Sequence, residues 1–235
     1  MINNIDFALL CYNEHRTIPL LVDHIVSITK DLNITDYRII IIDDGSDNRT
    51  KELLKSLCVK YPGLIEVVTH PVRMGYGAAH RSALLSSRKD WILYTDGDGQ
   101  YPIYNFKKFI DVYDSNIKFY TGRRINRQDS YIRRFITKIY NYLISIIFGV
   151  HLYDFGCAFR LIGKDILRYT IPQSDSGFSS AEQIIRCVKY KIELIEVEIE
   201  HKNRIYDKSR TFNILHIIKI IRDIIKVKWG LTRKK

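Results

Sequence analysis

The chain has 235 residues, of which 46% are hydrophobic and 27% charged, so it carries enough apolar material for a folded core. This composition excludes a disordered chain, and its four cysteines form no C-x-x-C pair that would indicate a zinc site or a disulfide scaffold. The net charge is +11, and residues 201–235 carry +9 of it. A strongly basic segment suits an anionic surface or a phosphate-bearing ligand. We do not expect nucleic acid as a partner, because no recognition motif accompanies the charge.

Targeting and membrane-spanning signals are weak. The N-terminal MINNIDFALL lacks a basic region and runs straight into a strand pattern, so no signal peptide is expected. The longest uncharged stretch, 139–153, is shorter than the ~20 apolar residues that a spanning helix needs. We therefore do not expect an integral membrane protein.

Strand and helix patterns alternate along the first half of the chain. The periodicity predicts strands over 5–11, 37–42, 65–69, 91–95 and 117–121, and helices over 17–32, 50–61, 77–87 and 105–114. The less regular second half predicts helices over 131–150, 181–189 and 212–228, with strands over 158–162 and 194–200. This order indicates an α/β fold, a mostly parallel sheet flanked by helices, ending in an amphipathic helix.

Unusual polar clusters follow four of the expected strands. They are Tyr12-Asn13-Glu14, Asp43-Asp44-Gly45-Ser46, Asp96-Gly97-Asp98-Gly99-Gln100 and Gly122-Arg123-Arg124. Each alone is compatible with a solvated turn, because Asp, Asn and Gly are turn residues. In an open α/β sheet, however, ligands bind at the carboxyl ends of the strands, so the four together predict a binding site.

The Asp96-Gly97-Asp98 cluster is the sharpest of these signals. Two carboxylates around a glycine at a strand end are able to share one divalent cation. Because Mg²⁺ usually completes its shell with substrate phosphates and water, a metal–diphosphate complex is the natural ligand. Asp43 and Asp44 add acceptors for ribose hydroxyls or a base edge.

These and later motifs occur in a recognisable order. Beside the clusters above, the chain has Gly75-x-Gly77-x-Ala79, Asp154-Phe155-Gly156-Cys157-Ala158-Phe159-Arg160-Leu161, Ala181-Glu182, and Arg204 with Ser209-Arg210. Over about residues 5–210 the set resembles family 2 glycosyltransferases of the GT-A fold, most of all the dolichyl- or polyprenyl-phosphate mannosyl- and glucosyltransferase branch. The resemblance implies a single Rossmann-like GT-A domain over 1–210, followed by a basic amphipathic helix and tail over 211–235.

The resemblance also implies a reaction, a metal-dependent and inverting transfer of a sugar from a UDP- or GDP-linked donor to a polyprenyl or dolichyl phosphate. The implied nucleotide-sugar site comprises Tyr12, Asn13, Glu14, Asp43, Asp44, Asp96 and Gln100. Mg²⁺ or Mn²⁺ would be held by Asp96 and Asp98, and the donor or acceptor phosphates by Arg124, Arg204, Lys208 and Arg210. A solvated charged face is the alternative for the basic residues.

A hydroxyl acceptor would need a general base, whereas an ionised phosphate acceptor would not. By resemblance, Asp154 is the first candidate for a base or acceptor-orienting group, and Glu182 is the second. Glu182 also opens a helix, where a carboxylate commonly serves the helix dipole.

The helices expected over 131–150 and 212–228 leave three interpretations open: packing in the core, contact with a membrane surface, or a homodimer. With the resemblance, we expect a cytoplasmic protein, peripheral on the inner face of the membrane. Two alternatives remain: the same enzyme class acting on a sugar hydroxyl of a cell-surface glycan, and a non-catalytic membrane-surface binding protein.

Overall fold

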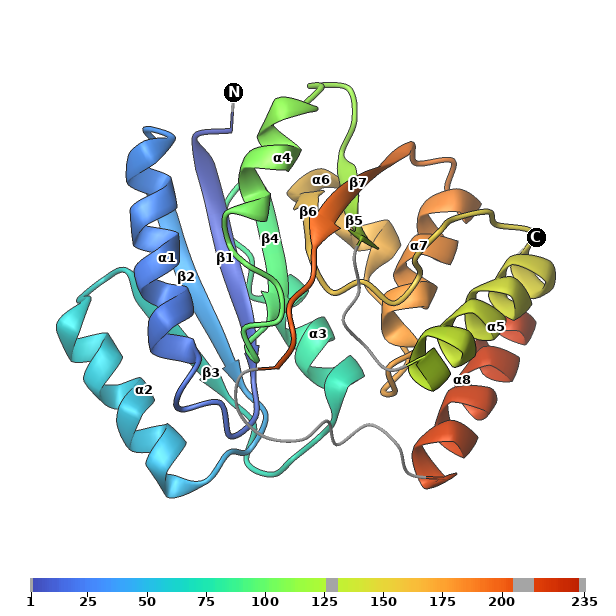
Figure 1. Cartoon of the computed structure of the whole chain (residues 1–235), viewed down its shortest axis with the longest axis horizontal. Helices are drawn as coiled ribbons and strands as arrows, with labels where there is room; N and C mark the ends of the chain where they lie inside the picture. The colour runs from blue at the N-terminus through green and yellow to red at the C-terminus, as the bar shows by residue number, and fades with distance from the viewer. Residues whose placement is uncertain (1, 126–130, 205–213, 233–235) are drawn as a thin grey trace.

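The computed structural model of the protein describes residues 2–125, 131–204 and 214–232 (Figure 1). Its strands are β1 (Asn4–Cys11), β2 (Asp36–Asp43), β3 (Ile65–Thr69), β4 (Trp91–Asp96), β5 (Phe119–Ile125), β6 (Arg160–Gly163) and β7 (Leu194–Glu200). Its helices are α1 (Ile18–Asp31), α2 (Asn48–Lys60), α3 (Tyr76–Leu85), α4 (Asn105–Asp111), α5 (Tyr131–Phe148), α6 (Lys164–Thr170), α7 (Ser179–Lys189) and α8 (Ile214–Thr232).

The sheet has the order β3-β2-β1-β4-β6-β5-β7. Strands β3, β2, β1 and β4 pair in parallel in that order. Strand β6 runs antiparallel to both of its neighbours, β4 and β5, and β5 pairs in parallel with β7. Apart from β6, every strand therefore ends at the same edge. The predicted α/β class with a mostly parallel, helix-flanked sheet is confirmed (Figure 1).

The apolar runs of the first strands explain the centre of the sheet. The run Ile39–Ile42 in β2 is fully buried, and β1 beside it is buried from Ile5 to Cys11. Such continuous runs suit parallel strands that are covered on both faces. Helix α1 adds a buried face that includes Ile18, Leu21 and Ile25, at the helical spacing of three and four residues.

Two elements differ from the prediction. Strand β5 was expected to end at Thr121 but continues to Ile125, so Arg123 and Arg124 lie within the strand and not in a loop after it. The reason is tertiary: residues 119–125 pair along their whole length with β7, and such pairing overrides local propensity. Helix α6 (Lys164–Thr170) was not predicted.

Helices α5 and α8 lie together at the end of the molecule that is away from α1 and α2 (Figure 1). Gly149, with φ of 68°, follows the last residue of α5 in the left-handed conformation typical of a helix end. Within the described ranges, no helix is both long and apolar enough to span a bilayer. The expected domain boundary at residue 210 falls between described segments, so this division stays a prediction.

Candidate active site

Strand register brings three acidic loops to one edge of the sheet. β1 lies between β2 and β4, with Cys11 beside Asp43 and Leu10 beside Asp96. Since neighbouring strands are about 4.8 Å apart, the ends of β2 and β4 lie about 10 Å from each other. The amide of Gly97 donates to the Leu10 carbonyl at 2.8 Å, which continues the pairing past the strand ends. The acidic ends of β2 and β4 thus flank the end of β1, as expected from the sequence.

The turn after β4 holds the two carboxylates of the predicted metal site. Asp96 ends the strand, and Asp98 accepts a hydrogen bond from the Gln100 amide at 3.0 Å. A Cβ at Gly97 would lie 2.6 Å from the Leu10 carbonyl oxygen, so the turn requires glycine there. Burial and the neighbouring Asp98 charge raise the pKa of Asp96 well above its ordinary value. The turn therefore concentrates negative charge that a cation would neutralise.

The donor set fits a divalent metal that is shared with a substrate. Among the residues that the structure describes, no three His, Cys, Asp or Glu side chains are grouped to hold an ion by themselves. Asp96 and Asp98 provide two carboxylates, and Mg²⁺ usually takes one or two together with substrate phosphates and water. The position of both carboxylates on one glycine turn, with Asp96 buried, favours a cation here.

The two acids after β2 have different surroundings. Asp43 accepts from the Ser46 amide through Oδ1 at 3.0 Å, while its buried Oδ2 has no hydrogen-bond partner in the described structure. Asp44 accepts from the amides of Met74 and Gly75 at 2.8 and 2.9 Å and from His70 Nδ1 at 2.8 Å. Asp43 therefore keeps one acceptor atom unused on a fully buried side chain, whereas Asp44 holds the loop before α3.

Asn13 connects the loop after β1 to the loop after β2. It adopts a φ of 59°, its amide donates to Ser46 Oγ at 2.9 Å, and its side-chain oxygen accepts from the Asp47 amide at 2.8 Å. The Arg73 guanidinium lies 4.2 Å from the centre of the Tyr12 ring. Asn13, predicted to bind the nucleotide, thus has its side-chain carbonyl engaged in shaping the site.

The segment after β7 crosses to the acidic turn. The Lys202 amide donates to the Gln100 carbonyl at 2.9 Å, and the Gln100 side chain donates back to the Lys202 carbonyl at 3.1 Å. Arg204 forms an ion pair with Glu14, so a predicted phosphate ligand and a predicted nucleotide ligand contact each other. The other two predicted phosphate ligands, Lys208 and Arg210, lie outside the described residues.

Thr17 is a site residue that the sequence reasoning missed. Its hydroxyl donates to the Gly97 carbonyl at 2.5 Å, which fixes the acidic turn against the start of α1. Its position directly before a helix with proline at the second residue is an N-cap signal. The Thr17 side chain does not cap the helix, however. The sequence signal would therefore have predicted a hydrogen bond to a backbone amide of α1 and not the observed one to the Gly97 carbonyl.

Asp154, the first candidate base, is held in a buried ion pair. Arg124 donates to its two oxygens through Nε at 2.6 Å and Nη2 at 2.8 Å, and both side chains are nearly buried. A bidentate guanidinium occupies the lone pairs that a base would use and favours the charged carboxylate. This geometry argues against Asp154 as a base and against Arg124 as a free phosphate ligand.

Glu182, the second candidate base, also has another role in this structure. It is fully buried, and it accepts from the amides of Gln173 and Ser174 at 3.0 and 2.8 Å and from Arg186 Nε at 2.7 Å. With its acceptors engaged and no exposed surface, it anchors the 173–174 loop to the first turn of α7. The surroundings of Glu182 favour the alternative interpretation, in which a carboxylate in the first turn stabilises the helix.

We predict that Glu182→Gln lowers the unfolding free energy by about 1–3 kcal/mol, because a charged acceptor for buried amides is lost. Denaturant unfolding measures this change, with the exposed Glu52→Gln as the control. A variant of unchanged stability with greatly reduced turnover would instead restore Glu182 as a catalytic base.

Arg160 is a further buried group with no predicted role. It is fully buried and donates to the carbonyls of Ser180 and Phe155 at 2.6 and 3.0 Å and to the side-chain oxygens of Gln183 and Thr121 at 3.0 and 3.2 Å. It thereby joins α7, β5 and the loop that carries the buried ion pair. An arginine within an apolar strand pattern is the sequence feature that would have predicted a buried, hydrogen-bonded guanidinium at this position.

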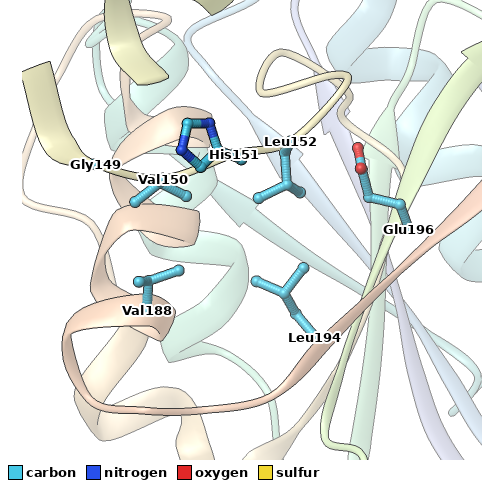
Figure 2. A pocket seen from close by; sticks show the side chains of 7 residues that line it. All are labelled: Gly149, Val150, His151, Leu152, Val188, Leu194 and Glu196. Atoms are coloured by element: carbon cyan, nitrogen blue, oxygen red, sulfur yellow. The ribbon is translucent and has the colours of Figure 1, made fainter. Parts of the chain in front are cut away.

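A pocket of about 340 Å³ lies between the end of α5, α7 and β7 (Figure 2). It is lined by Gly149, Val150, His151, Leu152, Val188, Leu194 and Glu196. Burial raises the pKa of Glu196, whose carboxylate accepts from the amides of Tyr153 and Asp154 at 3.1 Å. None of the carboxylates after β1, β2 and β4 lines it, so this pocket is separate from the acidic cluster.

The mixed, mostly parallel sheet flanked by helices matches the GT-A fold of glycosyltransferases, and solved structures share it. Glucosyl-3-phosphoglycerate synthase from Mycobacterium tuberculosis, in complex with phosphoglyceric acid, matches with a TM-score of 0.73 at 15% identity, over 97% of this chain and 80% of that one. The same enzyme in complex with Mn²⁺, UDP and phosphoglyceric acid matches with a TM-score of 0.70 at 16% identity, over 97% and 78%.

The family model of glycosyl transferase family 2 matches residues 7–170, and the chain belongs to this family. It is a glycosyltransferase, as the resemblance predicted. The undecaprenyl-phosphate 4-deoxy-4-formamido-L-arabinose transferase of Aeromonas hydrophila is 26% identical over 95% of this chain and 68% of its own length. The enzyme of the same name from Proteus mirabilis is 25% identical over 95% and 67%.

Proposed function

We propose that this glycosyltransferase moves a sugar from a nucleoside-diphosphate donor to a polyprenyl phosphate. The observation that carries the proposal is the pair Asp96 and Asp98, held together by a glycine turn at the same sheet edge as the unpartnered Oδ2 of Asp43, which lies on the other side of β1. It is supported by relatives named as undecaprenyl-phosphate sugar transferases and by a structural neighbour that binds UDP with Mn²⁺.

The donor site would use the acidic edge in two parts. Asp43 Oδ2 would accept from a base or a ribose hydroxyl, while Asn13 and Asp44 keep its loop in place. Asp96 and Asp98 would hold Mg²⁺ or Mn²⁺, which supplies Lewis-acid stabilisation to the diphosphate leaving group. The chain itself would position donor and acceptor for a direct, inverting displacement.

The choice between a phosphate and a hydroxyl acceptor rests on the surroundings of the two candidate bases, Asp154 and Glu182. The two carboxylates that the sequence offered as bases are committed, Asp154 to Arg124 and Glu182 to the 173–174 loop. A phosphate that is ionised at neutral pH attacks without a base, whereas a sugar hydroxyl needs one. This favours the lipid phosphate over a glycan hydroxyl, and we propose that transfer takes place on the cytoplasmic face of a membrane.

A transfer assay tests the acceptor class. The chain would be incubated with radiolabelled UDP- and GDP-sugars, Mn²⁺, and either polyprenyl phosphate in detergent or soluble oligosaccharides. We expect label to enter the organic phase with polyprenyl phosphate as the acceptor. Label that enters only the oligosaccharides would overturn the lipid acceptor and favour the glycan alternative.

A further inference from the structure

Helices α5 and α8 form one outer layer at the end of the molecule (Figure 1). Ile144 of α5 and Val227 of α8 are buried, so each helix packs one face against the body. The two helices also contact each other near their ends, where the Lys228 ammonium donates to the Ile147 carbonyl and lies 5.5 Å from the centre of the Phe148 ring. We call these two helices the outer pair.

The outward faces of the outer pair are unusually apolar. The exposed apolar side chains on α5 are Tyr131, Ile132, Phe135, Ile136, Ile139, Tyr142, Leu143 and Ile146, and those on α8 are Leu215, Ile217, Ile218, Ile221, Ile225 and Trp229. On both helices they recur every three or four residues, which makes a stripe along the helix. Scattered exposed apolar residues need no explanation, but a continuous set of this size marks an interaction surface.

The exposed charged side chains described on the same helices are all basic. The exposed ones among the described side chains are Arg134, Lys138, Lys219, Arg222, Lys226 and Lys228. The one acidic residue within the two helices, Asp223, is half-buried and accepts from the Ser176 amide at 3.1 Å. An apolar stripe flanked only by lysine and arginine, with aromatic rings such as Trp229 and Tyr142, suits an anionic lipid surface.

This charge pattern also argues against the main competing occupant. In a two-fold dimer the same patch meets itself, so the lysines and arginines of both copies would be brought together. A bilayer with anionic headgroups supplies the opposite charge, and its acyl region takes the apolar stripe. We propose that the outer pair lies flat on an anionic membrane surface with its stripes in the headgroup boundary. The proposal deepens the proposed function, on which it rests for the lipid acceptor, since it gives the surface that reaches this substrate.

Vesicle flotation of the full chain tests the proposal. The probes are vesicles of equimolar phosphatidylglycerol and phosphatidylcholine, and vesicles of phosphatidylcholine alone. We expect binding to the anionic vesicles, at least tenfold weaker binding to the neutral ones, and weaker binding at high salt. Ile139→Asp combined with Ile225→Asp should reduce binding at least tenfold, and Lys219→Gln or Lys226→Gln about fivefold each.

Matched controls come from helix α2 at the other end of the molecule. Val59→Asp changes an apolar residue that is more exposed than Ile139 and Ile225, and Lys55→Gln removes an exposed charge, so both should bind vesicles like the wild type. Failure of the full chain to bind anionic vesicles, or equal loss in the control variants, would overturn the proposal. A dimer in light scattering that the stripe variants convert to a monomer would assign the surface to a second copy instead.

Nucleotide binding by the same variants separates this proposal from the proposed function. The outer pair holds none of the acidic-edge residues, so the stripe variants should bind the donor nucleotide as the wild type does. A chain that binds nucleotide but no vesicles contradicts the membrane surface alone. A chain that binds vesicles but no nucleotide contradicts the donor site alone.

Discussion

Replacing Asp98 with Asn is expected to reduce sugar transfer about a thousandfold without lowering the stability of the protein. Loss of one of two metal carboxylates removes several kcal/mol of charge stabilisation in the transition state, and 1.36 kcal/mol is a factor of ten. Burial is the main reason that the pKa of Asp96 is raised, and the negative charge of Asp98 raises it further. In the protein without metal, the Asp98 charge therefore opposes folding. The folded state therefore disfavours the ionised form of Asp96 at neutral pH, and removing the neighbouring charge relieves part of this cost.

Initial rates of transfer and thermal unfolding at pH 7 measure the two effects on one preparation. Asp111→Asn, which changes an exposed aspartate on α4, is the control and should alter neither. An Asp98→Asn variant that keeps full transfer activity would show that Asp98 holds no metal that the reaction needs. A variant that is inactive because it is much less stable would give Asp98 a structural role.

The Arg124–Asp154 pair gives the second large effect. Arg124→Met should lower the unfolding free energy by about 3–5 kcal/mol, because it leaves a nearly buried carboxylate without its counter-charge. Asp154→Leu should be destabilising for the same reason, since it leaves the guanidinium unpaired. The double variant should cost much less than the sum of the two, because hydrophobic groups replace both charges together.

Chemical denaturation of the four proteins completes this double-mutant cycle. Lys107→Met, which breaks a half-exposed pair with Asp31, is the matched control and should change stability little. Additive costs would show that Arg124 and Asp154 act independently. If Asp154→Asn were as stable as the wild type but inactive, Asp154 would be the base that the sequence suggested.

The sheet and the position of the site were predictable because both depend on local patterns. The apolar run around Ile39–Ile42 identifies a covered parallel strand, and the acidic residues directly after such strands must meet at one edge. The end of β5 was not predictable in this way. Its extension through Arg124 depends on pairing with β7, whose residues lie 75 positions further along the chain.

The roles of single carboxylates were less predictable than their location. Asp154 and Glu182 look like candidate bases in the sequence, but Arg124 lies 30 residues before one of them, and the 173–174 loop of the other shows no pattern. Asp43 and Asp44 are neighbours in sequence, yet one has a buried free oxygen and the other holds the loop before α3. Which acceptors remain available is decided by distant partners, and a single sequence does not contain this information.

Titration calorimetry with UDP and GDP, with and without Mn²⁺, tests the donor site most directly. The account predicts that one of the two nucleotides binds to the wild type only when the metal is present. The same nucleotide should bind far more weakly, or not at all, to Asp98→Asn, while Asp111→Asn binds normally. Absence of binding with either nucleotide and metal, or binding that needs neither the metal nor Asp98, would contradict the account.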